Sequence, residues 1–206
     1  MTVRSAVFVI EQNVPQENEY DADDSRSAHW VIYASVNQTV SPAVTDPATG
    51  ETIRPRQSET TSVPIGTVRL NPPHHPPPTP LDRPTTHHNG TEPYVKLGRL
   101  AVTREFRGRG IAQQLILTAI NWMRKHPGYF DPSAAEQGCE QLGLEQGGTL
   151  PRWGGLICCH AQVDAVRVWE RCGFQVDEGM GSWMEEGIPH VGMFLRVEVE
   201  REAKKI

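Results

Sequence analysis

The residues whose types and spacing are best suited to binding or catalysis lie in the stretch Gly98–Met123. In it, an Arg-Gly-Arg-Gly turn at 107–110 joins two regular elements. A strand pattern ends near Val102, and after the turn apolar residues recur at spacings of three and four, which is typical of an amphipathic helix. The first turn of a helix has free N–H groups and partial positive charge, and glycines allow a ligand to approach the backbone. The pattern therefore predicts a pyrophosphate site on residues 107–112, with an ordinary strand–turn–helix corner as the alternative.

The elements that must position this turn follow from hydrophobic periodicity and from turn residues. Strands are expected at His29–Val36, Pro64–Leu70, Tyr94–Val102, Gly155–Gln162, Phe174–Asp177 and Val191–Val199, the last two flanking a turn-rich connector. Helices are expected at Val3–Gln12, Gly110–Lys125 and Asp164–Cys172, with a further short helix at Ser133–Leu144. This order predicts a mixed α/β sheet rather than a purely parallel one.

The whole chain, residues 1–206, reads as one domain with insertions at about 37–62, 71–93 and 126–154. The segment Ser41–Ser62 is polar and without periodicity, so we expect an extended loop. The segment Asn71–Pro93 is rich in proline and histidine, and we expect a surface loop that is partly polyproline-like. Its proline runs also fit an SH3-type or WW-type ligand, although a low-complexity loop is the simpler interpretation.

Composition excludes several classes of function. The formal net charge of −5 argues against a general nucleic-acid binder, and the absence of a long apolar run argues against a membrane span. The four cysteines and the two His-His pairs lack the spacing of metal ligands, so we expect no metal. We expect a cytoplasmic protein, with a nuclear location as the alternative.

Several segments resemble the GNAT (Gcn-related) N-acetyltransferase superfamily. Arg107-x-x-Gly110-x-Ala112 is similar to its Q/R-x-x-G-x-G/A signature, and the strand Leu100-Ala101-Val102 precedes it as in that family. The further segments Val7–Gln12, Gly66–Leu70, Ala161–Ala165, Cys172–Phe174 and Glu186–His190 follow in the order typical of the ElaA-like and YjcF-like branch. The resemblance implies a GNAT fold: a twisted, mostly antiparallel mixed sheet, a central splayed V between two parallel strands, and helices on both faces.

The same resemblance implies acetyl-CoA as the co-substrate and a binding site for it in the V. The pantetheine arm would lie along Leu100, Ala101 and Val102, and the thioester would point toward Leu100 and Cys159–Gln162. The pyrophosphate cradle would comprise Arg107, Gly108, Arg109, Gly110, Ile111, Ala112 and Gln113.

The catalytic pattern departs from the family at two positions. Many relatives carry a tyrosine acid where this chain has Trp169, and a glutamate base where it has Gly98. An indole N–H donates hydrogen bonds but cannot supply a proton at a useful pKa. The remaining candidates for proton transfer are Glu11, His160 and His190, followed by Asp23, Asp24, His29 and, as an acid, Cys172. For each of these residues a purely structural role is the alternative.

GNAT domains usually have a strand before the first helix, and this chain starts at that helix. We expect either a truncated sequence, another segment that covers the sheet edge, or a homodimer formed there. The function expected is transfer of an acetyl group from acetyl-CoA to a primary amine of a small molecule. A protein or peptide acetyltransferase and a catalytically weak acyl-CoA-binding module are the alternatives.

Overall fold

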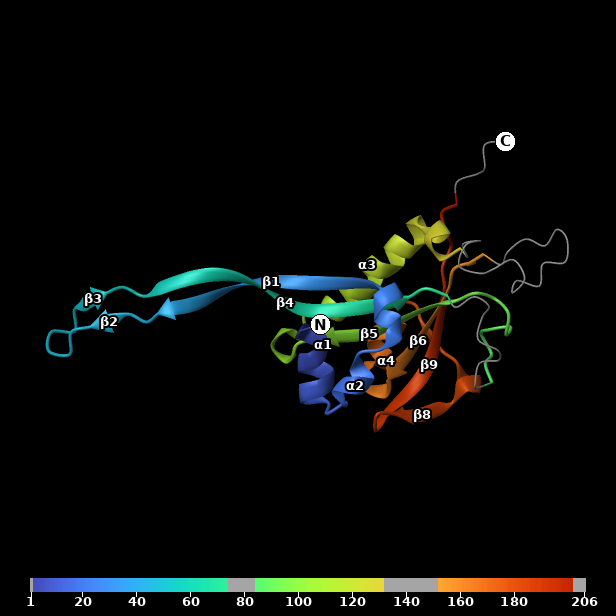
Figure 1. Ribbon diagram of the computed structural model, residues 1–206, viewed down its shortest axis with the longest axis horizontal. Helices are drawn as coiled ribbons and strands as arrows, with labels where there is room; N and C mark the ends of the chain where they lie inside the picture. The colour runs from blue at the N-terminus through green and yellow to red at the C-terminus, as the bar shows by residue number, and fades with distance from the viewer. Residues whose placement is uncertain (1, 74–83, 132–151, 202–206) are drawn as a thin grey trace.

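The centre of the computed structural model, which describes residues 2–73, 84–131 and 152–201, is a seven-stranded twisted sheet (Figure 1). Its strand order is β1–β4–β5–β6–β9–β7, and β8 pairs with β9. All described pairs are antiparallel except β5 with β6, which confirms the mixed, mostly antiparallel sheet. The bounds are β1 Ala28–Ser41, β4 Gln57–Asn71, β5 Val95–Val102, β6 Leu156–Gln162, β7 Gln175–Val176, β8 Ser182–Glu185 and β9 Ile188–Arg196.

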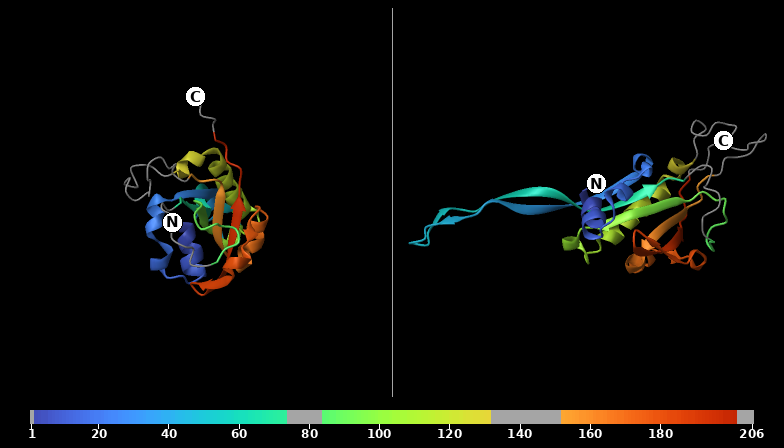
Figure 2. Two further views of the ribbon diagram at one scale, coloured as in Figure 1. Left: turned by 90° about the vertical axis from the view of Figure 1, so that its right-hand side faces the viewer. Right: turned by 60° about the horizontal axis from the view of Figure 1, so that its bottom comes forward.

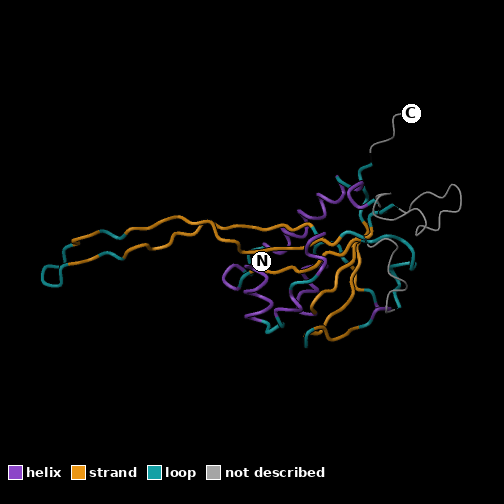
Figure 3. Tube along the Cα trace, viewed as in Figure 1, coloured by secondary structure: helices purple, strands orange, loops and turns teal. Residues whose placement is uncertain are grey.

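Helices cover both faces of the sheet, as expected (Figure 3). On one face α3 (Ile111–Lys125) and α4 (Val166–Glu170) close the main core. The apolar stripe of α3 is fully buried there, and burying each large apolar side chain contributes about 1.5–3 kcal/mol. On the other face lie α1 (Thr2–Arg4), the π-helical η1 (Ser5–Glu11) and α2 (Gln16–Glu19), where Val3 and Val7 pack against Ala101.

A bulge in β5 changes which side chains of this strand face each of the two cores. Leu97 and Val102 belong to the same core although an odd spacing would place them on opposite faces of a regular strand. The extra residue is Arg99, whose φ of 47° lies in the left-handed region, and the pairing of β5 with β4 shifts register there. Ala101 consequently faces η1 while Val102 faces α3.

The predicted helices are found with changed bounds. The strong helix predicted at Gly110–Lys125 is confirmed, whereas Val3–Gln12 divides into α1 and η1. The helix predicted at Asp164–Cys172 is a 3-10 turn, Val163–Ala165, followed by α4. Gly173 ends that segment with φ 95°, a conformation that suits glycine. The helix predicted at Ser133–Leu144 lies outside the described residues.

The predicted loop at Ser41–Ser62 is wrong, because this segment forms most of a long β-hairpin arm. The arm leaves the body of the protein as a twisted ribbon (Figure 2). Pairing of β1 with β4 continues out to Ser41 and Gln57, and β2 (Val44–Thr45) and β3 (Thr52–Arg54) extend it. Threonine and valine favour strands, but no layer covers the arm, so the alternating apolar pattern that reveals a strand is missing.

The connector predicted before the last strand is not only turns, because it contains the strand β8. The hairpin β8–β9 turns at Glu186 and Gly187, with φ values of 51° and 75°. Two successive residues with positive φ fit the tight turn of a two-residue hairpin. The strand is short, and its half-buried Ser-Trp-Met-Glu sequence gives too weak an alternation to be recognised.

The described part of the proline-rich insertion is held by one buried carboxylate. Asp177 accepts hydrogen bonds from Thr85 Oγ1 and from the backbone N–H groups of Thr86 and His87. The loop at 84–93 is therefore irregular in backbone but fixed in place against the sheet, with His87 stacked on Phe194.

Three arginines and three carboxylates form a closed ring of alternating charge between the N-terminal segment and the sheet. Two of its members, Arg69 and Arg99, come from β4 and β5, and the others come from α1, α2 and the segment up to η2 (Ala22–Arg26). The contacts run from Arg4 to Glu19, from Glu19 to Arg99 at 3.3 Å, from Arg99 to Asp21 at 3.1 Å, from Asp21 to Arg69 at 2.7 Å, from Arg69 to Asp24 at 2.8 Å and from Asp24 to Arg4 at 2.5 Å.

The most deeply buried pair of the ring consists of Arg4 and Glu19, which are 1% and 2% exposed. A buried ion without its partner costs far more than the pair contributes, so the ring holds only when all of its members are present. It fastens α1 and α2 to the face of the sheet on which Arg99 lies.

Replacing Arg4 with methionine should lower the free energy of unfolding by about 3–5 kcal/mol, because Glu19 and Asp24 would lose a buried partner. Urea denaturation measures this change. Arg56→Met removes an exposed arginine of the arm and serves as the matched control, with an expected change within about 0.5 kcal/mol. Equal effects of the two substitutions would contradict the structural role of the ring.

Stability should also fall in acid through Asp21 and Asp24. Burial opposes their ionisation, but the bonds from Arg69 to both and from Arg4 to Asp24 outweigh it and hold each pKa below its ordinary value. Their contribution is therefore complete above the unfolded pKa of about 3.9 and is lost as the pH falls through the lower folded values. Urea titrations between about pH 5 and pH 2 should show a shallower loss for Asp24→Asn than for the wild type. Parallel curves would show that this carboxylate is not responsible.

Candidate active site

The two parallel strands at the centre of the sheet separate after a short contact. β5 and β6 pair only at Val95 with Ile157 and at Lys96 with Cys158, whereas β5 continues to Val102 and β6 to Gln162. The expected splayed V is confirmed. Beyond Lys96 the edge of β5 that faces β6 has no strand partner in the described sheet, so its backbone groups are available to a ligand.

The predicted cradle lies where the chain passes from β5 into α3. Gly108 and Gly110 have φ values of 74° and 77°, and a Cβ atom at either position would meet no other atom within 4 Å. The two glycines are thus required by the left-handed backbone, and the space above them is open. The helix α3 begins directly after this turn. Its first N–H groups, at Ile111, Ala112 and Gln113, have no intrahelical acceptor.

The side chain of Arg107 is directed back toward the protein. Its Nε donates to the carbonyl of Val102 at 2.9 Å, and its two terminal nitrogens bind the Glu11 carboxylate at 2.6 and 2.7 Å. The bidentate ion pair between Arg107 and Glu11 holds the start of the cradle against η1. The Arg109 guanidinium lies over the Phe106 ring, 5.4 Å from its centroid.

Glu11, a predicted catalytic candidate, lies in this ion pair and does not line the central cavity. The hydrogen bonds from Arg107 lower the pKa of Glu11, which weakens it as a proton acceptor. The geometry gives Glu11 a role in holding Arg107.

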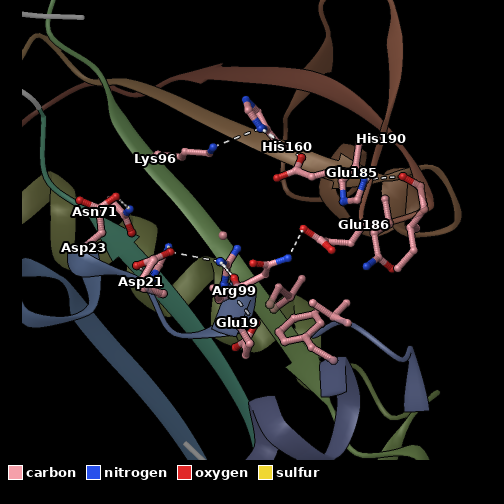
Figure 4. A pocket seen from close by; sticks show the side chains of 18 of the residues that line it. Glu19, Asp21, Asp23, Asn71, Lys96, Arg99, His160, Glu185, Glu186 and His190 are labelled. Carbon is pink, nitrogen blue, oxygen red and sulfur yellow. Dashed lines mark hydrogen bonds and ion pairs between the residues drawn. The ribbon is translucent and has the colours of Figure 1, made fainter. Parts of the chain in front are cut away.

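A cavity of about 470 Å³ opens from the V toward the face that carries η1 and α2 (Figure 4). Gly98 and Leu100 reach it from β5, His160 and Gln162 from β6, and the buried Trp169 from α4. Its wall also carries eight charged side chains: the carboxylates Glu19, Asp21, Asp23, Glu185 and Glu186 and the cations Arg69, Lys96 and Arg99.

His160 lies in a polar network within this cavity (Figure 4). The Lys96 ammonium donates to its Nδ1 at 3.1 Å, and Glu185 Oε2 lies 3.6 Å from the same nitrogen. Burial lowers the pKa of His160, and the charge of Lys96 adds to this effect, while the contact with Glu185 opposes it. Contact with His160 in turn lowers the pKa of Glu185, with a further contribution from Lys96.

His190 has a different geometry. Its Nδ1 lies 2.8 Å from the carbonyl oxygen of Ile188, and because a carbonyl only accepts, Nδ1 carries the proton. In the neutral ring the other nitrogen, Nε2, is then an acceptor. The residue is 9% exposed, lines the cavity and stacks against Trp183 at 6.5 Å. A ring oriented in this way has the form of a general base.

The other residues that the sequence offered for proton transfer lie in different surroundings. Asp23 lines the cavity and accepts a hydrogen bond from Asn71, whereas Asp24 belongs to the charged ring. His29 is not among the cavity residues. Cys172 packs in the core, where burial raises the pKa of its thiol, and it too is absent from the cavity wall.

The two departures from the family pattern both lie at the cavity. No atom lies within 4 Å of a Cβ built at Gly98, so a carboxylate is missing there without a side chain in its place. Trp169 is 2% exposed and packs edge-on against Phe174 at 5.0 Å.

Sequence reasoning missed Lys96 and Glu185. Lys96 lies between Val95 and Leu97 at the start of a strand. A lysine at such a position could have indicated a functional side chain. Glu185 lies in β8, which was not recognised as a strand, and only the pairing of β8 with β9 brings it to His160.

Among the described residues, no group of three or more His, Cys, Asp or Glu side chains is arranged to hold a metal ion. None of the helices described is both long enough and apolar enough to cross a bilayer.

Solved structures of similar proteins cover most of this chain. The Escherichia coli protein ElaA is 18% identical over 94% of this chain and 85% of its own, with a TM-score of 0.49. An acyl-CoA N-acyltransferase from Pseudomonas aeruginosa is 18% identical over 94% and 85%, with a TM-score of 0.46. The CoA-dependent acyl-homoserine lactone synthase BjaI, solved with SAM and isopentyl-CoA, is 12% identical over 95% and 72%, with a TM-score of 0.50, and shares the fold.

The family model of the acetyltransferase (GNAT) family matches residues 17–137, which is more than half of the chain. This range includes the bulged strand β5, the glycine turn and α3. The chain therefore belongs to the GNAT family of acetyltransferases and is an enzyme of that class.

Proposed function

We propose that this protein transfers an acetyl group from acetyl-CoA to a primary amine of a small molecule. The observation that carries the proposal is that the open V lies between a polar cavity, which Gly98 and Leu100 of β5 reach, and the glycine turn that follows β5. An acyl donor in the V would have its phosphates at the turn and its thioester beside the cavity.

The residues fit such a donor. The unpaired edge of β5, at Leu100, Ala101 and Val102, offers backbone groups for the amides of a pantetheine arm. The turn and first helical turn, Arg107 to Gln113, offer N–H groups and positive charge for a pyrophosphate. Coenzyme A, when bound, supplies the acetyl group as a thioester.

His190 is the best-placed base for an external amine. Its Nε2 accepts because Nδ1 donates to Ile188, and it can take the proton that the amine loses as the new bond forms. Backbone N–H groups on the open edge of β5 can stabilise the developing oxyanion. A thiol with a pKa of about 8.5 departs as a thiolate without a strong acid, so a tryptophan at position 169 is compatible with turnover.

The size and charge of the cavity favour a small cationic amine. A volume of about 470 Å³ is within the range of small-molecule sites, about 300–1,000 Å³. Five carboxylates against three cations on its wall leave a negative balance that attracts an ammonium group. A peptide acceptor and a non-catalytic CoA-binding module remain the alternatives that the experiments below separate.

Gly110→Trp should raise the KM for acetyl-CoA at least about tenfold, because the indole would occupy the open space where the phosphates are placed. Thiol release from acetyl-CoA over a panel of amines and peptides measures the change. Gly50→Trp is the matched control, since Gly50 has a φ of 71° and equally open surroundings but lies at the tip of the arm. Turnover that survives Gly110→Trp unchanged would refute the cradle.

His190→Asn should lower kcat by about 10²–10⁴-fold with a smaller change in the KM for acetyl-CoA, because the amide can still donate to Ile188 while the accepting nitrogen is lost. His29→Asn, outside the cavity, is the control. CoA binding with no thiol release from any amine or peptide in the wild type would instead favour the binding module.

A further inference from the structure

One primary amine is already present in the proposed acceptor cavity. The chain has four lysines, at 96, 125, 204 and 205. Lys96 lines the cavity, whereas Lys125 is exposed near the end of α3 and the other two lie outside the described residues. Lys96 thus shares a site with the groups that the proposed function assigns to acetyl transfer.

The position of Lys96 on β5 places its side chain at the closed end of the V. It is the last residue of β5 that pairs with β6, and Gly98 and Leu100 follow it along the wall of the same cavity. The thioester is expected beside Leu100 and residues 159–162, and His160 belongs to that stretch. The amine of Lys96 and the expected acyl carbon therefore meet the same imidazole.

His160 lines the cavity, but one of its two ring nitrogens is already engaged by Lys96. Its Nδ1 is the nitrogen that Lys96 Nζ contacts at 3.1 Å, and an external amine would have to displace Lys96 to use it. Glu185 lies 3.6 Å from the same nitrogen and can stabilise the ring when it is protonated. Trp183 packs edge-on against the ring at 4.9 Å and donates to Glu185 Oε2 at 3.2 Å, which holds both groups in place.

We propose that Lys96 is an acyl acceptor of this enzyme, so that the protein acetylates its own Lys96 Nζ in the presence of acetyl-CoA. This inference rests on the proposed function, because it uses the same donor and the same cavity. It assigns His190 to external amines and His160 to the internal one.

The step balances without a further reagent. The Lys96 ammonium gives one proton to water. Its free amine then attacks the thioester carbonyl while His160 Nδ1 takes the second amine proton, which becomes acidic as the bond forms. A C–N bond forms, the C–S bond breaks, and the imidazolium passes its proton to the departing thiolate, which leaves as free CoA thiol. The product is an amide at position 96.

Acetylation would remove a positive charge from the cavity and add an acyl group at the closed end of the V. His160 and Glu185 would lose their cationic neighbour, and the wall would become more negative. The modified enzyme should therefore differ from the unmodified one in its KM for amines.

The test is incubation of the full-length protein with deuterated acetyl-CoA and peptide mass spectrometry over time. The deuterium label distinguishes new acetyl groups from those acquired during expression. Lys96 should gain the label at least about tenfold faster than Lys125, at a first-order rate independent of protein concentration. His160→Asn and His160→Gln should slow labelling of Lys96 on the order of a hundredfold and leave Lys125 unchanged, and Lys96→Arg should abolish the labelled peptide.

The outcomes are separable. Labelling of Lys96 at the rate of Lys125, or labelling that does not depend on His160, is ordinary chemical acetylation and overturns the inference. Turnover of external amines without label on Lys96 also overturns it, while the proposed function stands. If neither external amines nor Lys96 react, and Gly110→Trp does not alter binding of acetyl-CoA, the proposed function fails and this inference fails with it.

Discussion

The charged ring of Arg4, Glu19, Arg99, Asp21, Arg69 and Asp24 is the constraint on which the site depends. Ion pairs at a protein surface contribute little, but Arg4, Glu19 and Arg69 are buried, and their partners in the ring make that burial tolerable. The ring joins α1, α2 and η2 to β4 and β5, which are otherwise far apart in the sequence. Together with the packing of Val3 and Val7 on Ala101, it holds one wall of the cavity in position.

Arg99 links this ring to the geometry of the V. Its left-handed backbone makes the bulge that turns Ala101 toward η1 and Val102 toward α3. The same local change brings its guanidinium to Glu19 and Asp21. A positive φ in a residue other than glycine costs free energy, and the ring and the two cores offset that cost. Arg99 therefore contributes the strained backbone of the bulge and two ion pairs of the ring, and it lies on the strand whose edge is open.

The cavity keeps its polar groups in two separate arrangements. His190 is oriented by a backbone carbonyl and has a free accepting nitrogen, whereas His160 is engaged by Lys96 and Glu185. Both histidines come from paired strands, β6 and β9, where His160 lies opposite Gly192 and His190 lies opposite Gln162. Rigid strands hold such groups more accurately than loops do, which suits proton transfer over short distances.

The sequence by itself determined the elements whose signals are local: the helix α3 with its apolar stripe, the glycine turn, most of the strands, and the family resemblance that predicted the V. It also identified His160 and His190 as candidates. It missed the arm at Ser41–Ser62, because no layer covers it, and the strand β8, because four residues are too few for its alternation to be recognised. Only the tertiary structure decided that Glu11 binds Arg107, that six charges close into a ring, and that Lys96 and Glu185 meet at His160. Contacts of this kind join residues from distant parts of the chain, and no local pattern of residue types records which charges will be buried together.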